Sequence, residues 1–72
     1  MLGMAQINTQ RLIDIGRNAL YFEDYVVAIQ YFNQVIKAKP HLTDPYLYRA
    51  YAKLSLEDYQ GAILDCNQAL EI

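Results

Sequence analysis

The chain resembles itself when residues 9–38 are aligned with residues 43–72, and this internal repeat constrains its fold more than any other feature. Nine of the thirty aligned pairs are identical, against about two expected from ordinary composition. The identical pairs are Thr9 and Thr43, Leu20 and Leu54, Glu23 and Glu57, Asp24 and Asp58, Tyr25 and Tyr59, Ala28 and Ala62, Ile29 and Ile63, Asn33 and Asn67, and Gln34 and Gln68. We call the offset from residue 9 to residue 43 one repeat length. A fixed period of this size indicates stacked supersecondary units, so we predict two copies of one unit.

Four segments have the hydrophobic periodicity of an α-helix, which predicts an all-α chain. The buried stripes, in chain order, are Leu12, Ile15, Gly16, Ala19 and Leu20; Ala28, Ile29, Phe32, Val35 and Ile36; Tyr46, Ala50 and Leu54; and Ala62, Ile63, Cys66, Ala69 and Leu70. Arg49 and Lys53 interrupt the third stripe. We expect their stems to be buried and their charged heads to be solvated.

Residues that start or stop helices stand at each break between these segments. Side chains that can cap a helix N-terminus are Asn8 or Thr9, then Asp24, Asp44 and Asp58. Pro40 ends the second helix, and Pro45 suits the first position of the third, where its missing N–H costs nothing. We predict helices over residues 9–21, 24–38, 44–55 and 58–72. The short connections between them require antiparallel neighbours.

Composition limits the class of protein. The chain has 72 residues, 54% of them hydrophobic, which excludes intrinsic disorder and permits one small domain. A formal charge of −2 provides no basic surface for nucleic acid or an anionic membrane. No run approaches the roughly 18 apolar residues of a membrane span, and the first residues lack the pattern of a signal peptide. A cytoplasmic location is the default expectation, and the compartment is otherwise left open.

No residue pattern predicts catalysis, a cofactor or a metal site. The paired acids at residues 23–24 and 57–58 directly precede helices, where capping explains both pairs. His41, the only histidine, has no Ser or Cys placed to form a nucleophile–base pair, and we interpret it as a surface residue. Cys66, the only cysteine, lies on an apolar stripe without metal-ligand spacing, so we expect a buried, unreactive thiol. We therefore predict a protein that is not an enzyme and binds no cofactor.

The two helix–turn–helix units resemble tetratricopeptide repeats, whose period is about 34 residues. Residues of the required size stand at the pattern's positions: Leu12, Ile15, Gly16, Tyr25, Ala28, Phe32 and Pro40 in the first unit, and Tyr46, Ala50, Tyr59, Ala62 and Ala69 in the second. Small residues such as Gly16 allow the two helices of a unit to approach closely. The resemblance implies a right-handed α–α solenoid fragment of four antiparallel helices. It implies an N-terminal extension over residues 1–8, one repeat over residues 9–42 and a second, truncated repeat over residues 43–72.

In tetratricopeptide arrays the first helices of successive units line a concave groove that binds peptides. Transferred position by position, the resemblance puts these residues on the groove: Ile13, Asp14, Arg17, Tyr21, Leu47, Tyr48, Tyr51 and Ser55. Tyr and Arg are favoured interface anchors because they bury area and keep a hydrogen-bonding tip. We therefore predict a protein or peptide partner, and no nucleic acid or membrane, for a site made of Asp14, Arg17, Tyr21, Tyr48 and Tyr51.

One alternative to a peptide-binding groove stays open, and one kind of ligand is disfavoured. The tyrosines can instead shield the core or a neighbouring repeat, which would make the chain a structural or capping segment of a longer array. Some family members clamp the C-terminal carboxylate of chaperones with Lys and Asn. Ile13, Arg17 and Tyr48 occupy those places here, which disfavours that ligand.

The last predicted helix has no following helix to cover its stripe of Ile63, Cys66 and Leu70. Each aliphatic side chain left in water forgoes about 1.5–3 kcal/mol of burial. That loss is large against the few kcal/mol that stabilise so small a domain. We therefore expect self-association through the C-terminal helix, most simply a twofold homodimer, and the alternative is a marginally stable monomer.

Overall fold

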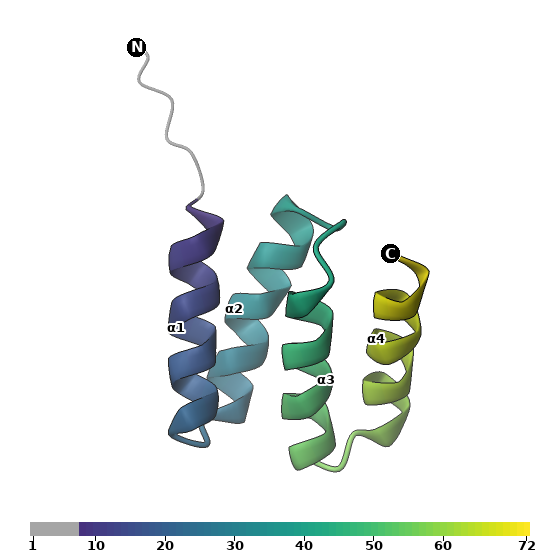
Figure 1. Cartoon of the computed structure of the whole chain (residues 1–72). Helices are drawn as coiled ribbons and strands as arrows, with labels where there is room; N and C mark the ends of the chain where they lie inside the picture. The colour runs from purple at the N-terminus through teal and green to yellow at the C-terminus, as the bar shows by residue number, and fades with distance from the viewer. Residues whose placement is uncertain (1–7) are drawn as a thin grey trace.

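The computed structural model describes residues 8–72, which form four α-helices (Figure 1). The helices are α1 (Thr9–Tyr21), α2 (Tyr25–Ala38), α3 (Asp44–Ser55) and α4 (Tyr59–Glu71). Residues 8–72 contain no strand, so the predicted all-α class is confirmed for them. Residues 1–7 of the predicted extension lie outside the described residues.

The helices pair into two hairpins, α1 with α2 and α3 with α4, and α3 also packs on α2 (Figure 1). Contacts thus run between neighbours in the sequence, as they do in stacked repeats. Each helix begins and ends within one residue of its predicted limits. This agreement follows from the strength of the local start and stop signals.

Two of the four expected caps are present as predicted. Asn8 Oδ1 accepts a hydrogen bond from the Arg11 N–H at 3.1 Å, and Asp58 Oδ1 accepts one from the Gly61 N–H at 3.0 Å. Asp24 stands at the N-cap position of α2 as predicted, but its side chain makes no capping hydrogen bond, so that part of the prediction was wrong. In α3 the cap position belongs to Thr43, while Asp44 is the first helical residue and puts its charge in the first turn.

Each hairpin turn contains a glutamate in the left-handed backbone region. Glu23 has φ 61° and Glu57 has φ 65°. In the first turn the Asp24 N–H reaches back to the Ala19 carbonyl at 2.8 Å, and the second turn repeats this bond between Asp58 and Lys53. This helix C-terminus is a Schellman motif, which usually has glycine at the left-handed position because a side chain there strains the backbone. The acid pairs therefore contain a strained turn residue that capping alone did not account for.

The core of the first unit lies between Gly16 and the α2 stripe. Phe32, Ala28 and Val35 are fully buried. A Cβ atom added at Gly16 would lie 2.7 Å from Phe32 Cζ, closer than real Cβ contacts allow. The predicted close approach of the two helices at Gly16 is therefore confirmed, and the phenylalanine ring fills the space that the missing side chain leaves.

The core of the second unit instead contains an ionic cluster. The buried Asp65 of α4 accepts hydrogen bonds from Arg49 Nε at 2.8 Å and from Arg49 Nη2 at 2.6 Å. Lys53 Nζ lies 3.1 Å from Asp65 Oδ2, and Arg49 Nη1 donates to Asn33 Oδ1 of α2 at 2.7 Å. The side chains of Arg49 and Lys53 are only 18% and 21% exposed. The expected solvated heads were therefore wrong, because both cations turn toward an acid on the facing helix.

The cluster keeps Asp65 ionised. Burial by itself raises the pKa of the Asp65 carboxyl, but hydrogen bonds and positive charge from Arg49 and Lys53 outweigh burial and lower that pKa below its ordinary value. Among the described residues no buried side-chain nitrogen or oxygen lacks a hydrogen-bond partner. At the matching positions, one repeat length earlier, the first unit has Ile15, Ala19 and Tyr31. The two units therefore use different chemistry at the same place.

Candidate functional site

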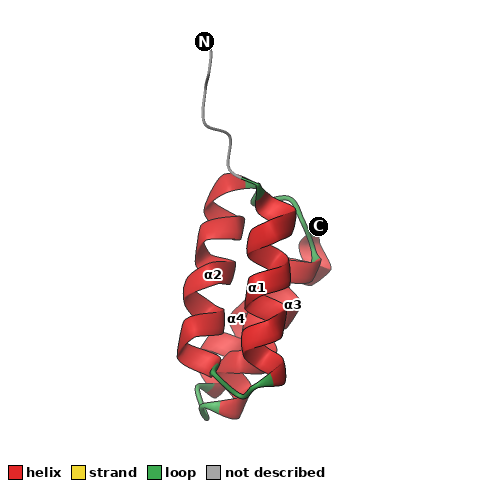
Figure 2. Cartoon of the chain, turned by 90° about the vertical axis from the view of Figure 1, so that its left-hand side faces the viewer, coloured by secondary structure: helices red, strands yellow, loops and turns green. Residues whose placement is uncertain are grey.

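The surface formed by α1 and α3 is the inner side of the helix stack. α1 contacts α3 directly, whereas α2 and α4 do not touch each other. The helices are therefore closer together on the α1 and α3 side, and the stack curves toward it. Figure 2 shows α1 and α3 on one side of the molecule and α2 on the other. We call this surface, with the predicted site residues on α1 and α3, the inner surface.

A stacked trio stands at the centre of the inner surface. The ring of Tyr48 stacks on the buried ring of Phe32, with centroids 5.4 Å apart and planes 29° apart. The guanidinium carbon of Arg17 lies 5.5 Å from the centroid of the Tyr48 ring. Such a cation–π contact orients the arginine without neutralising its charge. Arg17 is exposed and forms no ion pair with any of residues 8–72, so its N–H groups are available to an external acceptor.

Tyr51 and Asp14, two further predicted residues, are exposed on the same two helices. Tyr51 is 54% exposed on α3, and its ring meets the edge of Tyr25 with centroids 6.3 Å apart. Asp14 is exposed one turn before Arg17, and its carboxylate accepts a hydrogen bond from Gln10 at 2.9 Å. Both side chains thus have exposed surface free for a partner.

Of the five predicted residues, Tyr21 agrees least with the predicted site. It is 81% exposed at the end of α1, and its ring packs edge-on against Phe22 at 5.2 Å. The structure therefore brings Arg17 and Tyr48 into direct contact but gives Tyr21 an aromatic neighbour at the hairpin tip instead.

The titratable side chains of residues 8–72 do not gather at the inner surface as a metal site. No group of three or more His, Cys, Asp or Glu side chains in residues 8–72 could hold a metal ion. His41 is exposed on the α2–α3 loop. The carboxylate of Asp65, whose pKa is lowered, is occupied by Arg49 and Lys53 in the core. None of the helices in residues 8–72 is long and apolar enough to cross a membrane.

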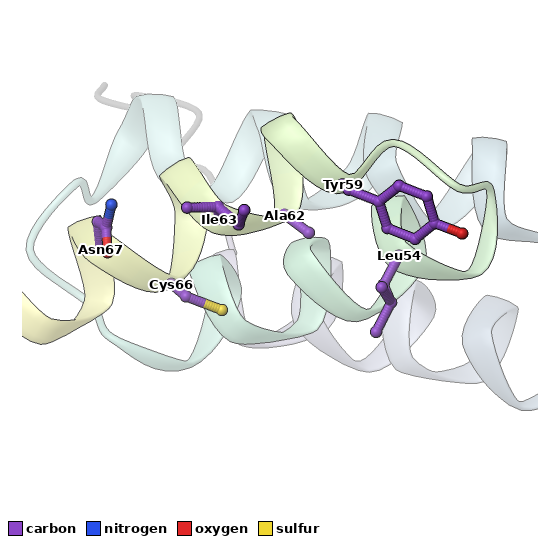
Figure 3. A pocket seen from close by; sticks show the side chains of 6 residues that line it. All are labelled: Leu54, Tyr59, Ala62, Ile63, Cys66 and Asn67. Atoms are coloured by element: carbon purple, nitrogen blue, oxygen red, sulfur yellow. The ribbon is translucent and has the colours of Figure 1, made fainter.

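A second candidate site lies on the apolar stripe of α4, which the sequence predicted to be uncovered, although the sequence did not predict a depression there. An open depression of about 410 Å³ lies on the side of α3 and α4 that faces away from α1 and α2 (Figure 3). Its lining consists of Leu54, Tyr59, Ala62, Ile63, Cys66 and Asn67. Cys66 is exposed there, so the expected buried thiol was wrong: none of residues 8–72 covers this side of α4. The exposed apolar stripe on the last predicted helix was the signal for it.

Comparison with known proteins finds three distant relatives at the level of sequence. The chain is 37% identical to sperm-associated antigen 1 of Rattus norvegicus over 57 residues, which are 79% of this chain and 6% of that protein. It is 35% identical to the Mus musculus protein of the same name over 57 residues. It is 30% identical to the protein SGT1 homolog of Oryza sativa subsp. japonica over 69 residues, which are 96% of this chain and 19% of that protein. The chain thus spans only a small part of each relative.

No protein-family model matches the chain, and no solved structure matches it significantly. The distant relatives contain tetratricopeptide repeats, and the four helices in two stacked hairpins are consistent with two such repeats. Together these findings indicate a small helical-repeat domain of the kind that takes part in protein–protein interaction.

Proposed function

We propose that the inner surface binds a segment of a partner protein, and that this segment brings an acidic group to Arg17. The supporting observation is the stacked trio, in which Phe32 fixes the Tyr48 ring and that ring orients an exposed arginine that forms no ion pair within residues 8–72. A guanidinium whose N–H groups are free is suited to two parallel hydrogen bonds with a carboxylate or phosphate.

The residues around Arg17 support a segment longer than a single acidic residue. Leu47 is 45% exposed and Tyr51 is 54% exposed on α3, so apolar side chains of the partner have surface to cover. Asp14 offers a carboxylate one turn from Arg17 on the same helix. The surface therefore favours a segment with an acidic group flanked by apolar residues and, toward Asp14, a hydrogen-bond donor.

Two arginines on α1 provide a matched test. Arg17 and Arg11 are both exposed, but only Arg17 lies over Tyr48. A peptide selected from a displayed random library should bind Arg17→Gln about tenfold more weakly, or about 1.4 kcal/mol, and Arg11→Gln unchanged. Tyr51→Ala should cost about 1–2 kcal/mol of binding free energy. If Arg17→Gln and Tyr51→Ala bound the peptide as tightly as Arg11→Gln, the peptide would bind elsewhere than on the inner surface.

The alternative function is structural support of further repeats or of a second copy of the chain. The observation that favours it is the uncovered side of α4, where Ile63 is 58% exposed and Leu70 is 84% exposed. A twofold dimer through α4 would cover both side chains. Sedimentation of the protein alone at micromolar and higher concentrations tests this alternative, since a dimer would dissociate in Leu70→Glu and a monomer would not change.

A further inference from the structure

We propose that the depression on α3 and α4 is a second docking site, which takes a basic amphipathic helix of a partner protein with an aromatic side chain at its centre. The depression is wide and apolar, with Ile63 58% exposed and Tyr59 56% exposed (Figure 3). Exposed apolar patches of this kind mark interaction surfaces. This site is separate from the inner surface and does not depend on the function proposed for it.

The chain contains its own template for what covers such a surface. Each lining residue has a counterpart one repeat length earlier, and the six counterparts are Leu20, Tyr25, Ala28, Ile29, Phe32 and Asn33. In the first unit α3 packs over this surface, so that Phe32 is fully buried and Ile29 is half-buried. In the second unit the counterparts Cys66 and Ile63 are exposed. The same surface therefore exists twice, covered by a helix in one unit and open in the other.

The contacts of α3 with the first unit show which side chains a docking helix uses. Three pairs are Tyr48 on Phe32 at 5.4 Å, Arg49 to Asn33 at 2.7 Å, and Tyr51 against Tyr25 at 6.3 Å. A shift of one repeat length carries the three receiving positions to Cys66, Asn67 and Tyr59, all of which line the depression. A helix seated there thus meets an amide that accepts a hydrogen bond and an aromatic edge, as α3 does.

The depression has more room at its centre than its covered counterpart. Cys66 stands where the first unit has Phe32, so the ring on which Tyr48 stacks has no equivalent. An aromatic side chain of a docking helix could fill that space and bury apolar area against Ala62 and the Cys66 sulfur. This favours a large aromatic residue at the centre of the partner helix.

The charge around the depression favours a basic helix. No Lys or Arg occurs after Lys53, and residues 54–72 contain four acids. Asp65 is paired in the core, whereas Glu57, Asp58 and Glu71 are exposed. A cationic helix would be attracted to this acidic end of the molecule, which raises the rate of encounter and favours such partners over acidic ones.

The same charges disfavour a second copy of the chain as the occupant. Antiparallel pairing of two α4 helices would bring Asp58 of one copy near Glu71 of the other, and parallel pairing would place identical acids side by side. Head-to-tail stacking would put α1 into the depression. α1 has Arg11 and Asn18 where α3 has the fully buried Pro45 and Ala52, so its outer side is polar. A helix from another protein fits better than either arrangement.

The test uses a synthetic peptide of residues 43–55, acetylated and amidated, because α3 is the helix that covers the equivalent surface. Two variants of the protein form a matched pair: Ile63→Ser changes the lining, and Leu64→Ser changes a neighbour that is 66% exposed and does not line it. We expect Ile63→Ser to weaken peptide binding about tenfold or more, because an aliphatic side chain then loses its burial. Leu64→Ser should leave the affinity unchanged. A peptide with Gln at both Arg49 and Lys53 should bind less tightly and with a weaker dependence on salt.

The parent protein provides a second readout that needs no substitution. Cys66 is the only cysteine and lies in the depression, so saturating peptide should slow its reaction with iodoacetamide about fivefold or more. Equal affinity of both serine variants, an unprotected Cys66, or no saturable binding would overturn the proposal. So would a protein that sediments as a dimer and becomes monomeric in Ile63→Ser, since a second copy would then occupy the site.

Discussion

Replacing Asp65 with asparagine tests whether the ionic cluster between α3 and α4 holds the second unit together. Asp65→Asn keeps the size of the side chain but removes the charge that receives Arg49 and Lys53. The new amide N–H group would also face the donating guanidinium. Two cations would remain in the core without their counter-ion, which is the costly outcome of breaking a buried ion pair.

The structure sets the expected size of this effect. Loss of one partner from a buried pair costs about 3–5 kcal/mol. Because Arg49 and Lys53 keep roughly a fifth of their side-chain surface in water, we reduce this to about 2–4 kcal/mol. A domain of 72 residues is stabilised by about 4–11 kcal/mol in total. The melting temperature should therefore fall by about 10–30 °C.

Urea denaturation followed by far-UV circular dichroism measures the effect, with the slope m unchanged if the loss is one of stability alone. The matched control transplants the first unit's residues: Arg49→Ile, Lys53→Ala and Asp65→Tyr together. Removal of all three charges should cost less than about 1 kcal/mol or even stabilise the fold. An Asp65→Asn loss below about 1 kcal/mol, or a triple variant as unstable as the single one, would refute this reasoning.

Three further predictions concern single positions. Gly16→Ala should destabilise the fold by about 1–3 kcal/mol despite alanine's better helix propensity, because the new methyl group meets Phe32; thermal denaturation checks this. Glu23→Gly and Glu57→Gly should each raise the free energy of unfolding by about 0.5–1 kcal/mol by relieving the left-handed position, and no gain in either would mean the turns are unstrained. The folded-state pKa of Asp65 is lowered. Its contribution to the free energy of unfolding is therefore complete above the ordinary carboxyl pKa of about 4 and is lost as the pH falls through the folded-state pKa. The free energy of unfolding should consequently fall less steeply with acid in Asp65→Asn than in the parent protein.

The helices and their order were predictable from the sequence because several boundaries have a local chemical cause. Asn8 caps α1, Pro40 stops α2, and Pro45 suits the start of α3. The internal repeat then predicts the same helix boundaries at corresponding positions of the two units. Helix limits within one residue of the structure follow from these two constraints.

The ionic cluster was not predicted because it depends on which faces of α3 and α4 meet. Arg49, Lys53 and Asp65 each depart from the apolar residue one repeat length earlier, and each departure taken singly indicates a solvated side chain. Taken together, they place two cationic residues and one acidic residue at positions that are in contact where α3 packs on α4. Comparison of the two units position by position is the signal that could have found the cluster.

The two candidate surfaces were predictable to different degrees. The inner surface followed from the resemblance to known repeats, and the structure adds that Arg17 and Tyr48 touch while Tyr21 packs on Phe22. For the depression, the sequence predicted that the apolar stripe of the last helix is uncovered, and the structure adds that Leu54 and Tyr59 complete a depression with it. The expectation of a buried Cys66 rested on its place in an apolar stripe and was wrong.

We propose that the inner surface binds a protein segment through Arg17 and Tyr48. The most direct measurement is an ¹H–¹⁵N NMR titration of the labelled protein with a peptide selected by binding to the unmodified chain. We predict saturable shifts centred on the backbone amides around Arg17, Tyr48 and Tyr51. The amides of α4 should shift only when the peptide of residues 43–55 is added as well. Shifts confined to α2 or α4, with the Arg17 side-chain signal unchanged at saturation, would contradict the claim.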